Sequence, residues 1–363
     1  MSPRRFRFVP PGWRVGLVLA AALAGSGAQL DAAAAAPGEP PANLRDTGLY
    51  RAGTGGPIAS GIASFTPQYP LWSDGTTKRR WLALPAGASI DASRPDAWVF
   101  PIGTRLWKEF AHAGGPVETR YIERRADGAW QFATYVWNAD ASDAVLAPRG
   151  GIATLPVTAA PGGRYAIPSQ ADCLACHAGS EVPVLGVSAL QLSPDRDPLA
   201  PNAVALAPGD ADLRDLAERG WLRDLPAELL AVPPRIAAAT PLERAALGDL
   251  HAICCNCHNT SEVRVPVRLI LDQSAAAPAA RRADVLRSAV DAPSRYRPAD
   301  IAGLARVIVS GQAAASVLIL RMASRDPQLQ MPPLGSRVPD PQGLALLRRW
   351  IDEELPTPLE HTP

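Results

Sequence analysis

The sequence contains the stretch Cys173-Leu-Ala-Cys176-His177 and, later in the chain, the stretch Cys254-Cys-Asn-Cys257-His258. Together they hold all five cysteines of the 363 residues. Each has the pattern Cys-x-x-Cys-His, which is the attachment signature of a c-type haem. Two thiols reach the two vinyl groups on one edge of the porphyrin, and the adjacent histidine ligates the iron. The spacing therefore predicts two covalent haems, held by Cys173, Cys176, His177, Cys254, Cys257 and His258.

Other uses of these cysteines fit the spacing less well. Zinc ribbons bring the second cysteine pair within about 15–20 residues of the first, much closer than here. A thioredoxin-like redox pair lies near a βαβ unit and needs no histidine. Structural disulfides seldom close two-residue loops. One residue separates Cys255 from Cys257, which is the wrong gap for haem attachment. We therefore expect Cys255 to take no part in binding haem.

Helix signals surround the second motif. Thr240-Pro-Leu-Glu243 is a capping box with proline at the first helical position, and it predicts a helix from Pro241 into Cys254. Asp340-Pro341 starts a second predicted helix. Apolar residues follow it at helical spacing, namely Leu344, Leu347, Ile351 and Leu355. Between the two helices lies Gln330-Met-Pro-Pro-Leu-Gly335.

This order of helix, haem motif, loop methionine and helix resembles the class I cytochrome c domain. The resemblance covers residues 240–357 and implies that the first and last helices cross beside the haem. It also implies that His258 is the proximal and Met331 the distal iron ligand, which raises the reduction potential relative to two histidines. Two alternatives stay open: Met331 is a core residue before a proline turn, or Met322 is the ligand.

The first motif lies in a segment, residues 166–239, that we expect to bind the first haem without a complete ligand set. Residues 178–250 contain no methionine, histidine, lysine, tyrosine or cysteine. The iron of the first haem is then either open on one side or takes a ligand from elsewhere. Among the donors we favour His251, one helical turn before Cys254. The others are His112, Met322 and His361.

Similar residues follow the two motifs. The segment Ala178-Gly-Ser-Glu-Val-Pro183 parallels Asn259-Thr-Ser-Glu-Val-Arg-Val-Pro266. We expect the carbonyl groups of Pro183 and Pro266 to bind the second ring nitrogen of each proximal histidine, as is usual for histidines that ligate a metal. A match of this length does not establish a duplication.

Residues 40–165 are rich in aromatic and β-branched residues, which favours strands. A compact hairpin turn is expected at Asp127-Gly128. The segments predicted as strands are Lys78–Leu84, Ala97–Phe100, Thr104–Phe110, Val117–Arg125 and Trp130–Trp137. Six of the nine tryptophans fall here, and we expect them to pack inside a β-sandwich-like domain; a carbohydrate-binding surface is the alternative. The expected fold class is α+β, with this domain followed by a mainly α-helical cytochrome c-like region.

Residues 1–36 have the features of a secretory signal peptide. Four arginines precede the apolar run Val15–Ala24, and small residues continue to Ala36. The run is short for a membrane span, so we expect a periplasmic protein without a stable span after cleavage; an uncleaved anchor is the alternative. With 36 basic and 35 acidic residues, and lysine only at Lys78 and Lys108, nothing indicates a nucleic-acid partner.

Six stretches together resemble a family of exported bacterial di-haem c-type cytochromes with a β-rich N-terminal part and a class I cytochrome c-like C-terminal part. They are Pro70–Gly75, Phe100–Phe110, Tyr135–Asn138, Ile167–Cys173, His251–His258 and Gln330–Gly335. The resemblance covers nearly all of the mature chain. It implies the architecture and the haems (iron) but no substrate. One departure is Cys255, where a residue without a thiol is expected.

Three functions remain open at this point. The leading hypothesis is a periplasmic electron carrier between redox protein partners, with no bond-making chemistry of its own. The second is a peroxidase-like di-haem oxidoreductase, in which an open first haem binds substrate. The third is a binding protein whose β-rich domain recognises a glycan or a partner. The coordination of the first iron separates the first two hypotheses.

Overall fold

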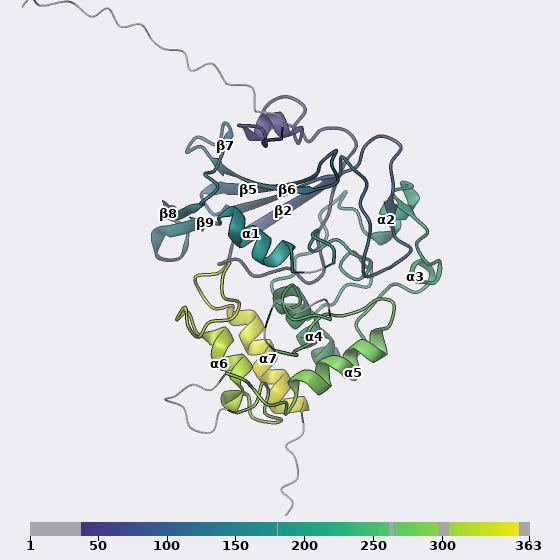
Figure 1. Ribbon diagram of the computed structural model, residues 1–363, viewed down its shortest axis with the longest axis vertical. Coiled ribbons are helices and arrows are strands. Elements are labelled where there is room, and N and C mark those ends of the chain that lie inside the picture. Colours follow the sequence, from purple (N-terminus) through teal and green to yellow (C-terminus); the bar gives the residue numbers. More distant parts are fainter. Residues whose placement is uncertain (1–37, 180, 261–264, 266, 297–304, 356–363) are drawn as a thin grey trace, which may run out of the picture.

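The computed structural model describes residues 38–179, 181–260, 265, 267–296 and 305–355. These residues form a layer of β-structure over a layer of helices (Figure 1). The expected signal peptide at residues 1–36 lies outside them. Among the described residues, no helix has both the length and the apolar character needed to cross a membrane.

One antiparallel sheet of six strands dominates the N-terminal half, in the order β1-β2-β4-β5-β6-β7. Its strands are β1 (Ile62–Ser64), β2 (Thr77–Ala83), β4 (Arg105–His112), β5 (Gly115–Arg124), β6 (Trp130–Trp137) and β7 (Ala144–Leu146). Two small ribbons pair β3 (Ile90–Asp91) with β10 (Leu222–Arg223), and β8 (Ile152–Pro156) with β9 (Arg164–Ile167). Four of the five predicted strands are thus confirmed, as is the Asp127-Gly128 turn between β5 and β6.

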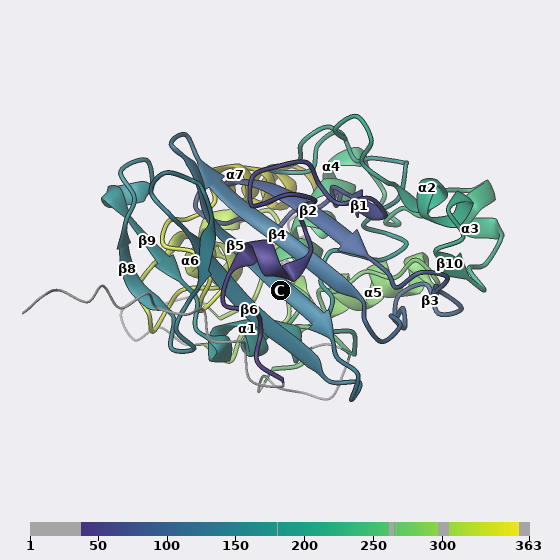
Figure 2. The same cartoon turned by 90° about the horizontal axis from the view of Figure 1, so that it is seen from above.

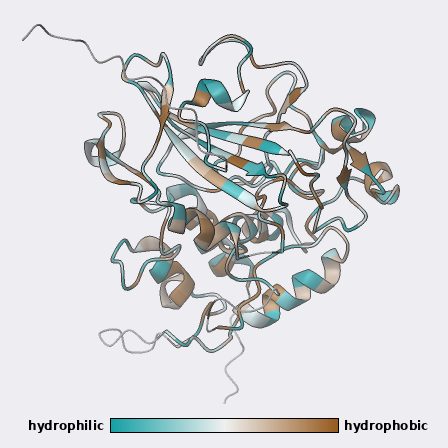
Figure 3. Cartoon of the chain, turned by 45° about the horizontal axis from the view of Figure 1, so that its top comes forward, coloured by the Kyte–Doolittle hydropathy of each residue, from teal (hydrophilic) through white to brown (hydrophobic). Residues whose placement is uncertain are grey.

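The outer face of the sheet is aromatic. Trp81, Trp107 and Tyr121 lie directly opposite one another on neighbouring strands, and all three are buried. Because side chains alternate between the faces of a strand, apolar and polar residues alternate along the sheet (Figure 3). The 3-10 helix η1 (Leu44–Thr47) and the chain after it cover this face (Figure 2). Four of the six N-terminal tryptophans are at most 9% exposed, which identifies them as packing residues: Trp81, Trp98, Trp107 and Trp137.

The inner face of the sheet packs on helices, so the expected sandwich is replaced by one large sheet on a helical layer within the described residues. Leu82 and Leu106 from this face share a core with Leu247 and Trp350. The predicted strand Ala97–Phe100 makes only a single bridge, from Val99 to Asp91. Prolines at both sides of that segment lack the N–H group that a longer ladder needs.

Within the described residues, seven α-helices lie mainly in the second half of the chain, and both helix starts predicted there are confirmed. The Thr240 hydroxyl accepts from the Glu243 N–H (3.0 Å), and the Asp340 carboxylate accepts from the Gln342 N–H (3.0 Å). The helices are α1 (Gln170–His177), α2 (Leu213–Glu218), α3 (Glu228–Ala231), α4 (Pro241–Cys254), α5 (Pro278–Ala289), α6 (Val317–Ala323) and α7 (Pro341–Glu354). Short 3-10 turns occur at Pro161–Gly163 and Ala313–Ala315.

Helices α4 and α7 pack against each other, as expected for the first and last helices of the C-terminal region. A methyl group added at Gly343 of α7 would lie 2.9 Å from Oδ2 of Asp249 in α4. The absence of a side chain at Gly343 therefore allows the close approach of the two helices. One apolar core runs from Ala63 in β1 to Ile351 in α7, so sheet and helices form a continuous interior.

Candidate cofactor site

Helix α1 presents the first motif. Its N-cap is Ser169, which forms a reciprocal pair of hydrogen bonds with Asp172: the Asp172 N–H donates to the Ser169 hydroxyl (3.1 Å), and the Ser169 N–H donates to the carboxylate (2.9 Å). Cys173 and Cys176 are three residues apart, which places both thiols on one side of the helix. The ring of His177 packs on Phe132 of β6, with 5.0 Å between ring centroids. The motif is therefore held against the inner face of the sheet (Figure 1).

His177 is oriented by its backbone contact. Its Nδ1 lies 2.6 Å from the carbonyl oxygen of Pro183, so the Pro183 contact predicted from the sequence is confirmed. A carbonyl only accepts hydrogen bonds, so Nδ1 carries the proton and Nε2 keeps a free lone pair. Burial lowers the pKa of His177 to about 4. The side chain is thus neutral at pH 7, the form in which imidazole binds a metal.

The second motif begins at the end of α4. The N–H groups of Cys257 and His258 both donate to the carbonyl of Cys254, at 3.2 and 2.9 Å, so the chain continues as a helical turn. Burial, followed by the charge of Arg321, lowers the pKa of His258. Its Nδ1 is buried and has no hydrogen-bond partner among the described residues. The partner expected for it, Pro266, lies outside them.

The turn that follows the first motif lies directly against the backbone of the second motif. A methyl group added at Gly179, two residues after His177, would lie 2.2 Å from the carbonyl oxygen of Asn256. The Asn259 amide also donates to the carbonyl of Gly179 (3.2 Å). Cofactors attached to these motifs would therefore be neighbours.

A cavity of about 840 Å³ borders the first motif, and this volume falls within the usual range of cofactor and ligand pockets. Cys173, Cys176 and His177 line one side of it. His251, Met322 and Met331 line it from the helical half.

The five cysteines form no disulfide with one another. Burial raises the pKa of the Cys176 thiol to about 11, and it raises the pKa of Cys173 as well. Both thiols are thus protonated at pH 7 and available for thioether formation. The Cys255 thiol contacts the side-chain oxygen of Asn256 (3.6 Å) and lines the cavity.

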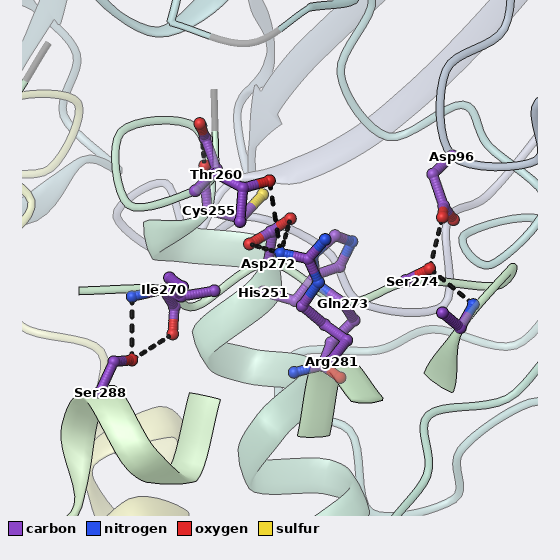
Figure 4. A network of polar contacts seen from close by, with 12 residues as sticks. Asp96, His251, Cys255, Thr260, Ile270, Asp272, Gln273, Ser274, Arg281 and Ser288 are labelled. Carbon is purple, nitrogen blue, oxygen red and sulfur yellow. Dashed lines mark hydrogen bonds and ion pairs between the residues drawn. The ribbon is translucent and has the colours of Figure 1, made fainter. Parts of the chain in front are cut away.

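His251 has a different hydrogen-bond environment from His177. Its Nδ1 accepts a hydrogen bond from the backbone N–H of Gln273 (3.1 Å; Figure 4). Nδ1 therefore carries no proton, and in the neutral ring the proton is on Nε2. Burial lowers the pKa of His251 to about 4, which keeps the ring neutral. With this tautomer Nε2 is a hydrogen-bond donor and has no free lone pair for iron.

The remaining ligand candidates fall in different places. Met322 is 4% exposed in α6 and belongs to the apolar core, although it also lines the cavity. The Met331 N–H donates to the carbonyl of Arg321 (3.0 Å), the residue whose charge acts on His258. His112 ends β4, packs on Tyr165 and is not among the residues that line the cavity. His361 lies outside the described residues.

Sequence reasoning missed a row of cations on the inner face of the sheet. Arg80 of β2, Lys108 of β4 and Arg120 of β5 are direct cross-strand partners, and all three line the cavity. Arg120 is paired with the buried carboxylate of Glu118 (2.6 Å). Strand alternation puts these cations on the same face as Leu82 and Leu106, and this pattern was readable once the strands were paired.

Among the described residues, no cluster of three or more histidine, cysteine or acidic side chains is arranged to hold a metal ion by itself. No family model, no curated protein and no solved structure matches this chain.

Proposed function

We propose that the chain is an exported di-haem c-type cytochrome that transfers electrons between redox protein partners. The observation that carries the proposal is the contact of two Cys-x-x-Cys-His motifs at Gly179 and Asn256, beside a cavity of about 840 Å³. A bound haem would supply a one-electron redox centre. Export is proposed from the arginines and the apolar run of residues 1–36.

Each motif offers residues that suit a covalent haem. The thiols of Cys173 and Cys176 would attach the first group, and the free Nε2 of His177 would ligate its iron. Cys254, Cys257 and His258 would serve the second group in the same roles.

We further propose that residues 240–357 form the class I cytochrome c-like part. Support comes from the packing of α4 on α7 and from the position of Met331. The backbone of Met331 is bonded to Arg321, which lies within electrostatic reach of His258. These contacts favour Met331 over Met322, a buried core residue, as distal ligand of the second haem.

A second candidate function is a peroxidase-like oxidoreductase, and one observation favours it. The ring of His251 lines the cavity of the first motif, and its Nε2 carries the proton. This nitrogen is therefore better suited to donate a hydrogen bond to a substrate than to bind iron. Reduction of a peroxide to two waters consumes two electrons and two protons. Redox partners would supply the electrons, through the second haem.

The spin state of the first haem separates the two functions. Optical and electron paramagnetic resonance spectra of the purified protein would show two low-spin haems for a pure carrier, and one high-spin haem for an open first site. Replacing His251 with alanine should leave the spin state of both haems unchanged, because His251 is assigned as a donor. Conversion of one haem to high spin in this variant would identify His251 as the ligand instead.

A further inference from the structure

The cation row on the inner face of the sheet contains one buried charge, Arg80, and one half-buried charge, Lys108, that form no ion pair among the described residues. Arg80 is 7% exposed, and neither its guanidinium nor the Lys108 ammonium forms a hydrogen bond or ion pair within the described residues. The Lys108 ammonium lies over the ring of Phe110, 4.8 Å from the ring centroid. Buried charges are normally paired, because removing them from water is costly. These two groups therefore call for an anion.

The carboxylates nearest Arg80 and Lys108 act on them without a direct ion pair among the described residues: Asp210 acts on Arg80, and Glu118 acts on Lys108. Burial lowers the pKa of Arg80 to about 10. Burial, then the neighbouring charges of Arg80, Lys78 and Arg120, lowers the pKa of Lys108. Lys78 and Lys108 are the two lysines of the chain, and both lie on this face of the sheet. Of the three cations, Arg120 alone forms an ion pair among the described residues, with Glu118.

The strand order gives the order of the three cations relative to the first motif. Helix α1 lies on β6, and the strand order then continues through β5, β4 and β2. Neighbouring strands are about 4.8 Å apart. Arg120 is thus nearest the motif, Lys108 is one strand further, and Arg80 is two strands further. A group attached to α1 that extends across the cavity reaches Lys108, which also acts electrostatically on Cys176 and His177, and then Arg80.

We propose that Arg80 and Lys108 form the binding site for the two propionate carboxylates of the haem attached at Cys173 and Cys176. The carboxylates of a haem stand on the porphyrin edge opposite the thioether bonds, which matches the direction of the row. The inference rests on the proposed function. It also gives the sheet a role: β2 and β4 supply the charges that hold the far edge of a cofactor whose near edge is bound by α1.

The test compares potentiometric titrations of the first haem in the holoprotein. Arg80→Gln combined with Lys108→Met should raise the ratio of oxidised to reduced first haem at a fixed ambient potential by about a hundredfold, about tenfold for each cation lost, because each charge is about 10 Å from the iron at an effective dielectric constant of about 20. Arg214→Gln, which removes an exposed charge from α2, should change the ratio less than about twofold. Arg80→Lys keeps the charge and should behave like the unmodified protein.

A pH series shows whether the cations hold carboxylates. With the pair intact, the potential of the first haem should be constant between about pH 5 and pH 8. Without it, the propionate pKa rises and the potential should fall with increasing pH across this range. A potential that stays independent of pH in the double variant overturns the inference, and Lys108→Met alone gives the same readout if the double variant does not fold.

Two controls separate this inference from its alternatives. Adding succinate to the unmodified holoprotein should not change its spectrum or potential, because propionates occupy the pair. A response to succinate that disappears in the double variant would assign the pair to a free anion and contradict the inference. If peptide mapping finds no haem on Cys173 and Cys176, the proposed function itself fails. If haem is attached to Cys173 and Cys176 but the variants have no effect, only the assignment of the propionate site is wrong.

Discussion

At the scale of single residues, two histidines that line one cavity have opposite hydrogen-bond environments. The carbonyl of Pro183 accepts from Nδ1 of His177, whereas Nδ1 of His251 accepts from the Gln273 N–H. Each contact fixes the position of the proton on a neutral ring. Nε2 therefore has a free lone pair in His177 and carries the proton in His251, and one backbone group determines the difference in each case.

Asp249 is a residue whose protonation should affect stability. It is 3% exposed in α4, its Oδ2 has no hydrogen-bond partner among the described residues, and burial followed by the charge of Asp340 raises its pKa to about 8. In the unfolded chain the pKa returns to about 3.9. Between about pH 4 and pH 8 the unfolded state has released this proton while the folded state retains it, so stability falls as pH rises.

We therefore expect Asp249→Asn to be more stable than the unmodified protein at pH 7. The contribution of Asp249 to the free energy of unfolding should decrease by about 1 kcal/mol per pH unit between pH 4 and 8, and asparagine should remove it. Urea denaturation of the holoprotein at pH 5 and at pH 8 measures both effects. Equal pH dependence in the two proteins would contradict the assignment.

At the scale of elements, the turn after α1 and the end of α4 meet without space for a side chain. Gly179 lies against the carbonyl of Asn256 and receives a hydrogen bond from Asn259 on its own carbonyl. The elements are far apart in the sequence, and this contact keeps the two motifs together. Electron exchange between the motifs depends on it if both carry haem.

Gly179→Ala should separate these elements. Its Cβ would lie 2.2 Å from the Asn256 oxygen, and relief of such overlap requires backbone movement that costs about 1–3 kcal/mol. Gly114→Ala is the matched control, because nothing lies within 4 Å of the added methyl group. Denaturant midpoints of the two variants provide the comparison. Similar midpoints would mean that the contact tolerates a side chain.

At the scale of the whole molecule, one core joins the sheet to the helices, and the candidate site lies between these two layers. The sheet contributes Phe132 against His177 and the cation row, and the helical half contributes His251, Met322 and Met331. We infer that the β-rich part is one wall of the site for the first cofactor.

Local features of this molecule were predictable from the sequence. The caps at Thr240 and Asp340 gave the starts of α4 and α7, and the residue order around His177 gave the Pro183 contact. Both depend on residues a few positions apart.

Features that depend on distant pairing were not predictable. The single large sheet, the contact of Gly179 with Asn256, and the alignment of Arg80 with Lys108 require strand order and register to be known. The proton position on His251 likewise depends on Gln273, which lies beyond the second motif in the sequence. Periodicity within one segment contains no information on such contacts.

The most direct test of the central claim is the haem content of the purified mature protein, measured by peptide mapping with mass spectrometry. We expect one haem on the peptide with Cys173 and Cys176 and one on the peptide with Cys254 and Cys257, with Cys255 unmodified. Cys255→Ser should retain both haems. A protein expressed with haem available that carries no haem on either peptide would contradict the account.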